Sequence, residues 1–499
     1  MPPRRYLITG AAACALLVAA ACSSSPTRSS TPAPPDWFAE TEPDPLDGAT
    51  SLTFPPTELV PAPVLAPTDG GGAGSAQTDE SPGEPAPRSR GLIAAAGPTG
   101  LRLLAPDGAL VGELGPAHIV TQPTWSRDGR RLVATLTDPA SGTSQVAVVD
   151  ITTGDVLTAA ARRPYFFYSW NHEGTRVAAL GPGSSGGTAL DILDGSGAPT
   201  STSSLQSDTV FVAWEPEGSR LLIHAGPQLY MLSDPDSPGD HENLGPVGFG
   251  FQAAAWVPGT QDFLYVDSVS PALDTAPPED LSGEAGPEAG PRLVRRHAGS
   301  GATVNLGPAT GFAAMAVHPQ GSRAALSLLD PPTPESEGSA NAGALDSLEG
   351  TGDGAAPERP APQQWDGSVQ IVDLATGERS IAIEHPGFWL EWSPDGRNLL
   401  IATALPTGNE RLRLTWHVWN GESAVEVTQF TPSVAFARNY LPFADQYDET
   451  PRLWSPDSDA ITFGANTADG DVTVVARIDR AGEVASLGPS DVSFWSPLP

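Results

Sequence analysis

Short apolar stretches recur along the chain, and a large residue followed by a polar turn marks each one. The clearest copy is residues 392–397 (WSPDGR), which lead directly into the apolar stretch 398–402 (NLLIA). Asp and Gly suit a tight reversal, because Asp bonds its own backbone and Gly accepts a positive φ without a steric penalty. Apolar runs bounded by such turn residues are typical of β-strands. The pattern therefore predicts antiparallel strand pairs joined at this turn.

The unit is repeated along most of the chain. Its copies begin at Trp125 (WSRDGR), Trp170 (WNHEGT), Trp214 (WEPEGS), Trp256 (WVPGTQ), Val317 (VHPQGS), Trp392 (WSPDGR), Trp454 (WSPDSD) and Trp495 (WSP). The first four tryptophans are 45, 44 and 42 residues apart and the last two are 41 apart, which is the length of one propeller blade. One blade cannot bury both of its faces, so we expect the repeats to stack with the Trp side chain between neighbouring sheets.

The two ends of the repeat region predict a closed ring. Residues 492–495 (VSFW) resemble an innermost strand, whereas residues 91–96, 101–104 and 109–114 read as second, third and fourth strands without a first. Pairing the two ends would complete one blade and remove two open sheet edges. We therefore predict an all-β protein with a single β-propeller over residues 91–499. It has eight four-stranded blades, or seven if one weak unit is not a blade.

These units resemble the PD40-type repeat of TolB-like propellers, a subset of the wider WD40-like group. The resemblance covers about residues 91–499 and rests on the WSPDG core. Two units depart from it, because the Val317 unit lacks Trp and the Trp256 unit lacks Asp-Gly. The resemblance implies a binding or scaffolding propeller, which in this family is sometimes fused to a peptidase domain. Because the chain stops at the last repeat, we expect no such domain here.

The N-terminus predicts export and a lipid anchor. Arg4 and Arg5 precede an apolar stretch at 7–21, which is short for a membrane-spanning helix. The stretch ends in Ala-Ala-Ala before Cys22, so residues 1–21 resemble a bacterial lipoprotein signal peptide, and cleavage would make Cys22 the lipidated first residue. The alternative is an ordinary secretory signal cut nearby. We expect a protein held by lipid on the extracytoplasmic side of a bacterial membrane, inner or outer, after general or twin-arginine export.

Residues 22–90 are predicted to form a disordered tether. They are rich in Pro, Ser, Thr, Gly and acidic residues and poor in aliphatic ones, so they cannot bury enough apolar surface to offset chain entropy. Two stretches of similar composition, at about 268–291 and 331–364, lengthen the spacing between repeats. We predict that both are disordered insertions between strands.

Composition limits the partners. The chain has 26 basic and 59 acidic residues for a net charge of −33, and every basic residue is Arg. Loss of residues 1–21, which hold two Arg and no acidic residue, would take the charge from −33 to −35. Nucleic acids and anionic lipids need a basic surface, so we expect neither to bind the propeller body directly. The two cysteines are Cys14 and Cys22, so no disulfide and no thiolate metal site is expected.

Catalytic and metal-binding patterns are sparse. Residues 183–187 (GSSGG) match the G-x-S-x-G pattern, but they lie in a glycine-serine run between two predicted strands rather than in a strand-to-helix turn. The eight His are scattered, without the close pairs of a metal site. Asp234, Asp236 and Asp240 miss the spacing of a calcium loop. We expect no enzyme activity, no cofactor and no metal; the alternative is a propeller hydrolase or lyase with a site in the central channel.

One segment is a candidate for binding. Residues 430–450 (FTPSVAFARNYLPFADQYDET) lie between two repeats and are rich in aromatics. Aromatic side chains and Arg commonly anchor interfaces, and the candidate partner-binding residues are Phe436, Arg438, Asn439, Tyr440, Phe443 and Tyr447. The alternative is a loop that folds back over blades six and seven and buries its own aromatics. The expected function is a non-catalytic, monomeric, membrane-anchored module that binds or scaffolds a protein, peptide or envelope polymer.

Overall fold

The computed structural model describes residues 39–40, 91–237, 241–248, 250–268, 290–330, 366–405, 412–447, 452–468, 470–479 and 483–497. The predicted signal peptide with Cys22, most of the predicted tether, and nearly all of the two predicted insertions lie outside these residues. Those interpretations therefore stay predictions. No helix within the described ranges is long and apolar enough to cross a membrane.

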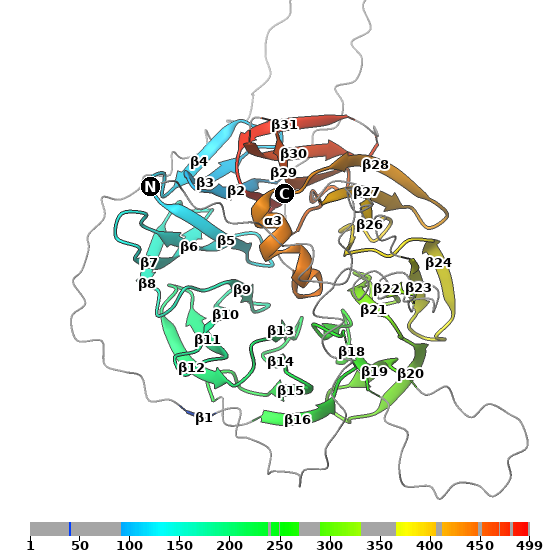
Figure 1. The fold of residues 1–499 in the computed structure, drawn as a ribbon. Helices are drawn as coiled ribbons and strands as arrows, with labels where there is room; N and C mark the ends of the chain where they lie inside the picture. Colours follow the sequence, from blue (N-terminus) through cyan, green and yellow to red (C-terminus); the bar gives the residue numbers. More distant parts are fainter. Residues whose placement is uncertain are drawn as a thin grey trace, which may run out of the picture.

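Eight twisted sheets are arranged as a ring, and each sheet is one blade (Figure 1). Blade 1 contains β2 (Ile93–Gly97), β3 (Gly100–Leu104), β4 (Leu110–Leu114) and β32 (Val492–Trp495). Blade 2 contains β5 (Ile119–Trp125), β6 (Arg131–Thr137), β7 (Ser144–Asp150) and β8 (Val156–Ala160). Blade 3 contains β9 (Phe167–Trp170), β10 (Arg176–Pro182), β11 (Thr188–Asp194) and β12 (Pro199–Leu205), and β1 (Ala39–Glu40) adds to its outer edge. Blade 4 contains β13 (Val210–Trp214), β14 (Leu221–Ala225), β15 (Gln228–Leu232) and β16 (His241–Pro246).

The second half of the ring follows the same plan. Blade 5 contains β17 (Ala255–Trp256), β18 (Asp262–Asp267), β19 (Arg292–His297) and β20 (Thr303–Pro308). Blade 6 contains β21 (Phe312–Val317), β22 (Arg323–Leu329), β23 (Gly367–Asp373) and β24 (Arg379–Ile383). Blade 7 contains β25 (Trp389–Trp392), β26 (Leu399–Leu405), β27 (Arg413–Trp419) and β28 (Ala424–Phe430). Blade 8 contains β29 (Ala460–Thr467), β30 (Gly470–Arg477) and β31 (Val484–Pro489).

Blade 8 has its fourth, innermost strand in a reduced form. Trp454 bridges Ile461 of β29, and Thr462 N donates to Leu453 O at 2.8 Å, so the chain at 452–454 occupies the inner position. The prediction of an all-β propeller with eight blades rather than seven is therefore confirmed. The units that begin at Trp256 and Val317, which depart from the repeat, both form blades.

The ring closes as predicted, by pairing the two ends of the propeller chain. β32 pairs with β2 in an antiparallel register that places Phe494 opposite Ala94. Phe494 and Trp495 are completely buried at this seam, as is Ile93. Closure thus brings residues about 400 positions apart into one sheet and leaves no open blade edge between them.

The closing blade contains one repeat unit split between the two chain ends. In the unbroken unit of blade 7, Ser393 Oγ accepts a hydrogen bond from Asn398 N at 3.0 Å across the turn. At the seam, Ser496 Oγ accepts from Leu92 N at the same distance of 3.0 Å. The turn contact is therefore present at the seam, although Ser496 and Leu92 are 404 residues apart in sequence.

The repeated Trp does more than fill the space between blades. In six blades its indole N–H donates to a carbonyl of the preceding blade, always that of the residue just before the repeat position. The bonds join Trp125 to Phe494 (3.3 Å), Trp170 to Thr124 (3.0 Å), Trp214 to Ser169 (3.0 Å), Trp256 to Ala213 (3.0 Å), Trp392 to Ala316 (3.2 Å) and Trp454 to Glu391 (3.0 Å). These bonds link neighbouring inner strands around the ring.

Two seams lack this bond. At the first, Val317 has no indole to donate. On the other side of its blade, His318 packs against Trp392 with ring centroids 4.8 Å apart, and Arg323 stacks 4.8 Å above the same indole. Trp495 has an indole that is buried but has no hydrogen-bond partner among the described residues. The indole of Trp495 therefore contributes through packing alone.

This difference gives a matched test. Trp125→Phe should lower the free energy of unfolding by about 1 kcal/mol more than Trp495→Phe, because only the first change removes a buried hydrogen bond. Both substitutions remove the same atoms from fully buried sites. Urea unfolding followed by circular dichroism measures the difference, and equal losses would contradict the role assigned to the indole bond.

Candidate functional site

The aromatic segment predicted between two repeats lies across the centre of the ring (Figure 1). It forms α3 (Val434–Asn439) and a 3-10 segment, η3 (Leu441–Tyr447). Ser433 begins the helix, because its Oγ accepts from Phe436 N at 3.2 Å. A helix of six residues is not stable in isolation, so contacts with the ring must hold it. We call residues 433–447 the plug.

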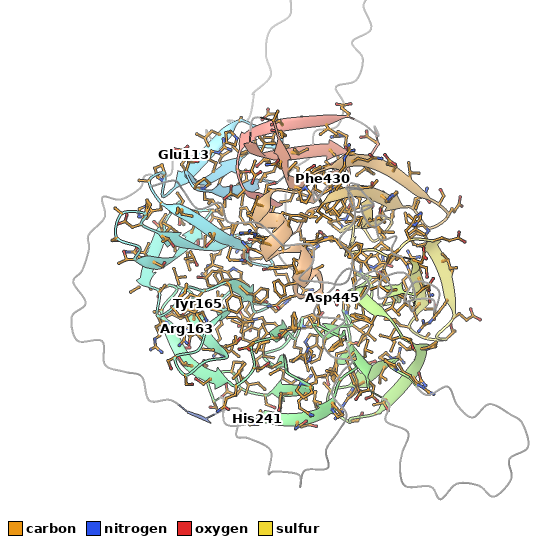
Figure 2. All side chains as sticks on the ribbon, in the orientation of Figure 1. Glu113, Arg163, Tyr165, His241, Phe430 and Asp445 are labelled. Atoms are coloured by element: carbon orange, nitrogen blue, oxygen red, sulfur yellow. The ribbon has the colours of Figure 1, made fainter. Side chains whose placement is uncertain are left out.

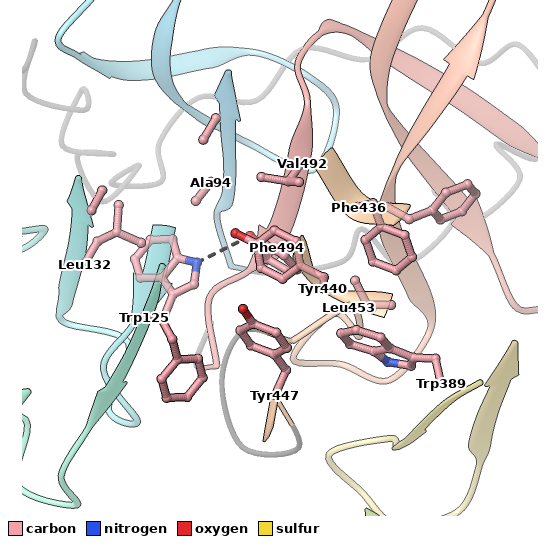
Figure 3. Close-up of a cluster of buried hydrophobic side chains, with 14 of the residues drawn as sticks. Ala94, Trp125, Leu132, Trp389, Phe436, Tyr440, Tyr447, Leu453, Val492 and Phe494 are labelled. Carbon is pink, nitrogen blue, oxygen red and sulfur yellow. Dashed lines mark hydrogen bonds between the residues drawn. The ribbon is translucent and has the colours of Figure 1, made fainter. Parts of the chain in front are cut away.

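Three aromatic side chains of the plug are buried inside the ring (Figure 3). Phe436 is 0% exposed, and Tyr440 and Tyr447 are each 2% exposed. Phe436 lies 5.4 Å from the Trp389 ring of blade 7, and Tyr440 lies 5.0 Å from the Phe494 ring of blade 1. Their packing joins inner strands from different blades into a shared apolar centre.

The other blades also touch the plug. Tyr447 packs on Phe167 of blade 3 at 5.3 Å, and Phe443 on Phe211 of blade 4 at 6.3 Å. The remaining contacts are hydrogen bonds: Tyr447 OH to Gln122 Oε1 in blade 2 (3.3 Å), Gln252 Nε2 before blade 5 to Pro442 O (3.0 Å), Met315 N in blade 6 to Asp445 Oδ1 (2.9 Å), and Ser433 N to Gly464 O in blade 8 (3.1 Å). The plug therefore contacts the inner side of the whole ring.

Gln122 shows backbone strain at this contact. It has a φ of 54°, which a non-glycine residue adopts only at a cost of about 1–2 kcal/mol. The strand ladder of blade 2 shifts register between Thr121 and Thr124 at the same place. The bulge turns the Gln122 side chain to Tyr447, so the inner strand is distorted where it meets the plug.

The plug divides the six candidate binding residues into two groups. Phe436, Tyr440 and Tyr447 are buried, so these three candidates do not lie on the surface of this structure. Arg438, Asn439 and Phe443 are exposed at the mouth of the ring, and Phe443 is 40% exposed. The segment does bury most of its aromatics, as the alternative held, but it does so in the channel and not over blades six and seven.

Glu391 is a buried acidic residue at the centre of the ring that sequence reasoning missed. Its side chain is 3% exposed and lies between blades 7 and 8. The carboxylate accepts from Trp389 Nε1 at 3.1 Å, Leu453 N at 3.0 Å and Trp454 N at 3.4 Å. The sequence does contain a signal for it, because the residue just before the repeat position is uncharged in every other unit, where it is Thr, Ser, Ala, Leu or Phe. Glu391 thus holds the short inner strand that follows the plug.

Burial raises the pKa of Glu391 to about 7, although the hydrogen bond from Trp389, the charge of Arg452 and the backbone N–H groups act to lower it. Burial also raises the pKa of Tyr440 and Tyr447 above that of a free phenol. Both phenols therefore remain neutral over the physiological range. The charge of Glu391 therefore changes near neutral pH.

The raised pKa predicts a pH-dependent stability. In the folded chain Glu391 keeps its proton up to about pH 7, whereas in the unfolded chain it loses the proton near pH 4.5. The contribution of Glu391 to the free energy of unfolding is therefore complete below pH 4.5 and is lost as the pH rises to 7. Relative to Glu391→Gln, the wild type should lose about 3 kcal/mol of unfolding free energy between pH 4.5 and 8. Urea unfolding of both proteins across this range measures the loss. A difference that does not vary with pH would contradict the assignment.

A cavity of about 30 Å³ lies beside Asp445 and Gln446, against the inner strands of blades 3 to 5. Such a volume is comparable to that of one water molecule. Asp445 lies near the ring centre in Figure 2, whereas Arg163 and Tyr165 lie out in blade 3.

Residues 183–187 form a hairpin loop between two strands, as their position in the sequence predicted. Gly183 N donates to Gly187 O at 2.9 Å, which closes a hairpin loop between β10 and β11. Ser185 is exposed on this loop, and a strand rather than a helix follows it. Within the described ranges, no three His, Cys, Asp or Glu side chains gather as metal ligands.

Comparison with known proteins supports the fold alone. No protein-family profile and no curated protein sequence matches the chain. A solved structure of the dihydro-heme d1 dehydrogenase NirN is similar, at 12% identity and a TM-score of 0.50, over 84% of this chain and 78% of that one. A eukaryotic initiation factor is similar at 12% identity and a TM-score of 0.48, over 82% and 99% of the two chains. TolB from Acinetobacter baumannii is similar at 16% identity and a TM-score of 0.34, over 59% and 63%.

Proposed function

We propose that this protein is a non-catalytic binding propeller that acts from a lipid anchor and presents its plug to a partner. The observation that carries the proposal is the filling of the ring centre by buried Phe436, Tyr440 and Tyr447. A ligand site in a propeller channel needs an open mouth and convergent polar groups. Here the same space is occupied by aromatic side chains that touch the inner side of the ring.

The exposed side of the plug has the properties of an interface. Arg438 and Phe443 are residue types that are enriched at protein interfaces, and Val434 beside them is 53% exposed. Their backbone is held by the buried side of the plug, so little conformational entropy is lost when a partner binds. The proposed binding residues are therefore Arg438, Asn439 and Phe443, supported from beneath by the three buried aromatics.

Anchoring follows from the N-terminal sequence. We propose that Cys22 carries lipid and that residues 22–90 connect it to the ring. The body of the protein is strongly acidic, so attraction to anionic lipid would not hold it at a membrane. Mass spectrometry of Cys22 tests this part, and Cys22→Ser should release the protein from the membrane fraction. Retention of the variant there would contradict lipid anchoring.

The binding proposal is tested by capture from envelope extract with the full-length chain after cross-linking. The plug variant Arg438→Ser/Phe443→Ser should retain less than about one tenth of the captured partner, which corresponds to a loss of about 1.4 kcal/mol. The matched control is Arg130→Ser/Leu157→Ser, which changes an exposed Arg and an exposed apolar residue in blade 2 away from the plug. Equal capture by both variants would contradict binding through the plug.

One observation favours the enzyme alternative, because a carboxyl group with a pKa near 7 suits general acid-base chemistry. Glu391, however, is enclosed, and N–H donors from Trp389, Leu453 and Trp454 face its oxygens. A substrate would have to displace these donors. A hydrolase and lyase screen of the full-length protein should find no turnover; activity lost in Glu391→Gln would favour the enzyme.

A further inference from the structure

A cleft lies in the outer half of the ring, between the neighbouring blades 6 and 7 (Figure 1). Its volume is about 620 Å³, within the range of roughly 300–1,000 Å³ that is usual for ligand sites. One wall is β24 with the two residues after it, and the other is formed by β27 and β28. The lining includes Ile381, Ile383, Glu384, His385, His417 and Glu426. We propose that this outer cleft binds an aliphatic cation, an ammonium or guanidinium group carried on a hydrocarbon stem.

Two carboxylates line the outer cleft from different blades. Glu384 directly follows β24 of blade 6, and Glu426 lies on β28 of blade 7. Both are exposed, and neither forms an ion pair within the described ranges. Glu426 Oε1 accepts a hydrogen bond from the neutral Gln429 Nε2 at 3.1 Å. A cation in the cleft would therefore meet carboxylates that the protein's own cations do not neutralise, and hydrogen bonds between such ions are the strong ones.

The outer cleft also has an apolar side. Ile381 is 58% exposed, and Ile383 is partly buried against the core that blades 6 and 7 share. Aliphatic stems such as those of Lys and Arg lie along apolar surface while their charged ends stay in a polar environment. A metal ion would gain nothing from the isoleucines, and no group of three metal-ligating side chains is found in the described part of the chain. The lining therefore fits an organic cation.

His417 forms part of the blade 7 wall. It lies opposite Glu426 in the register of β27 and β28, so the two side chains share one face of the sheet. His417 Nε2 and Thr403 Oγ1 are hydrogen-bonded at 3.1 Å, which orients the ring. Burial lowers the pKa of His417, the charge of Glu426 acts to raise it, and His385 acts to lower it. His417 is therefore neutral at pH 7 and leaves the charge of Glu426 to a ligand.

Two sources carry an aliphatic cation of this kind. One is a free amine, and the other is an Arg or Lys side chain that a partner protein presents. The net charge of −33 attracts cations of both kinds to the surface. The plug lies at the centre of the ring and the outer cleft lies in its outer half (Figure 1), so the proposal does not rest on binding through the plug.

Isothermal titration calorimetry of the full-length chain tests the proposal at about 0.15 M salt, which screens long-range attraction. The probes are agmatine, a free aliphatic cation, and the blocked peptide acetyl-Gly-Arg-Gly-amide. Glu384→Gln/Glu426→Gln should bind at least about tenfold more weakly than the wild type. The matched control is Glu113→Gln/Glu217→Gln, which removes the same two charges from exposed positions in blades 1 and 4.

The outcomes separate the two sources. Binding of agmatine alone would identify a free amine, whereas binding of the peptide would identify a presented side chain, and both results support the cleft if only the Glu384→Gln/Glu426→Gln variant is impaired. The peptide with citrulline in place of Arg has nearly the same shape without the charge and should bind at least about tenfold more weakly. If the two variants bind alike, if neither probe binds the wild type, or if the citrulline peptide binds equally well, the proposal is overturned.

Acidification gives an independent readout. As the pH falls from 7 to 5, protonation of His417 places a positive charge opposite Glu426, so the affinity for agmatine should fall by at least about threefold. Calorimetry at both pH values measures the change. An affinity that stays constant or rises on acidification would overturn the assignment of the cleft to a cation.

Discussion

Phe436→Ala is expected to lower the free energy of unfolding by about 3–5 kcal/mol, the usual cost of truncating a fully buried Phe. The side chain is 0% exposed and packs against Trp389, Trp416 and Tyr440. These rings belong to the plug and to blade 7, so the resulting cavity cannot close by the movement of one loop. The loss would be measured by urea unfolding of the full-length protein.

The control for this prediction is Phe443→Ala. It removes the same atoms from the same plug, but Phe443 is 40% exposed, so the expected loss is at most about 1 kcal/mol. Similar losses for the two variants would show that Phe436 is not in the core of the ring. The two variants thus compare a buried side chain of the plug with an exposed one.

Removal of residues 490–499 is expected to abolish cooperative folding. The deletion removes the buried side chains of Val492, Phe494 and Trp495, which together contribute about 5–9 kcal/mol by burial. The total stability of a folded domain is about 5–15 kcal/mol. The deletion also leaves β2 as an open edge at the seam.

A permuted chain provides the control for this deletion. Residues 490–497 can be placed before Gly91 and joined by Asp-Gly, because Ser496 already lies against Leu92. The same residues would then form an unbroken repeat, and thermal unfolding should return to within a few degrees of the wild type. If the deletion alone folds cooperatively, or the permuted chain fails to fold, ring closure through β32 is contradicted.

The blades could be predicted from sequence because each repeat carries its own turn and its own large residue. Even the units at Trp256 and Val317 could be assigned, since spacing and flanking strands remained when Trp or Asp-Gly was absent. The target of each indole could not be predicted, because it is a carbonyl of the preceding blade. That contact depends on how two sheets are rotated relative to each other and not on local pattern.

The plug was recognised as a segment but not as the filling of the channel. Its partners, such as Gln122 and Met315, lie more than a hundred residues away in sequence and have no distinctive type. Composition alone also cannot say which aromatics of a short insertion are buried. Glu391 offered a clearer signal, because a charged residue in an inner strand next to a repeat position must find donors in the folded protein.

The filled channel is most directly tested by hydrogen exchange of residues 434–447 in the full-length protein. A six-residue helix has no stability of its own, so slow exchange there can arise only from docking in the ring. The account predicts that these amides exchange at least about a thousandfold more slowly than in a free peptide. Exchange at the rate of a free peptide, while the inner strands remain protected, would contradict it.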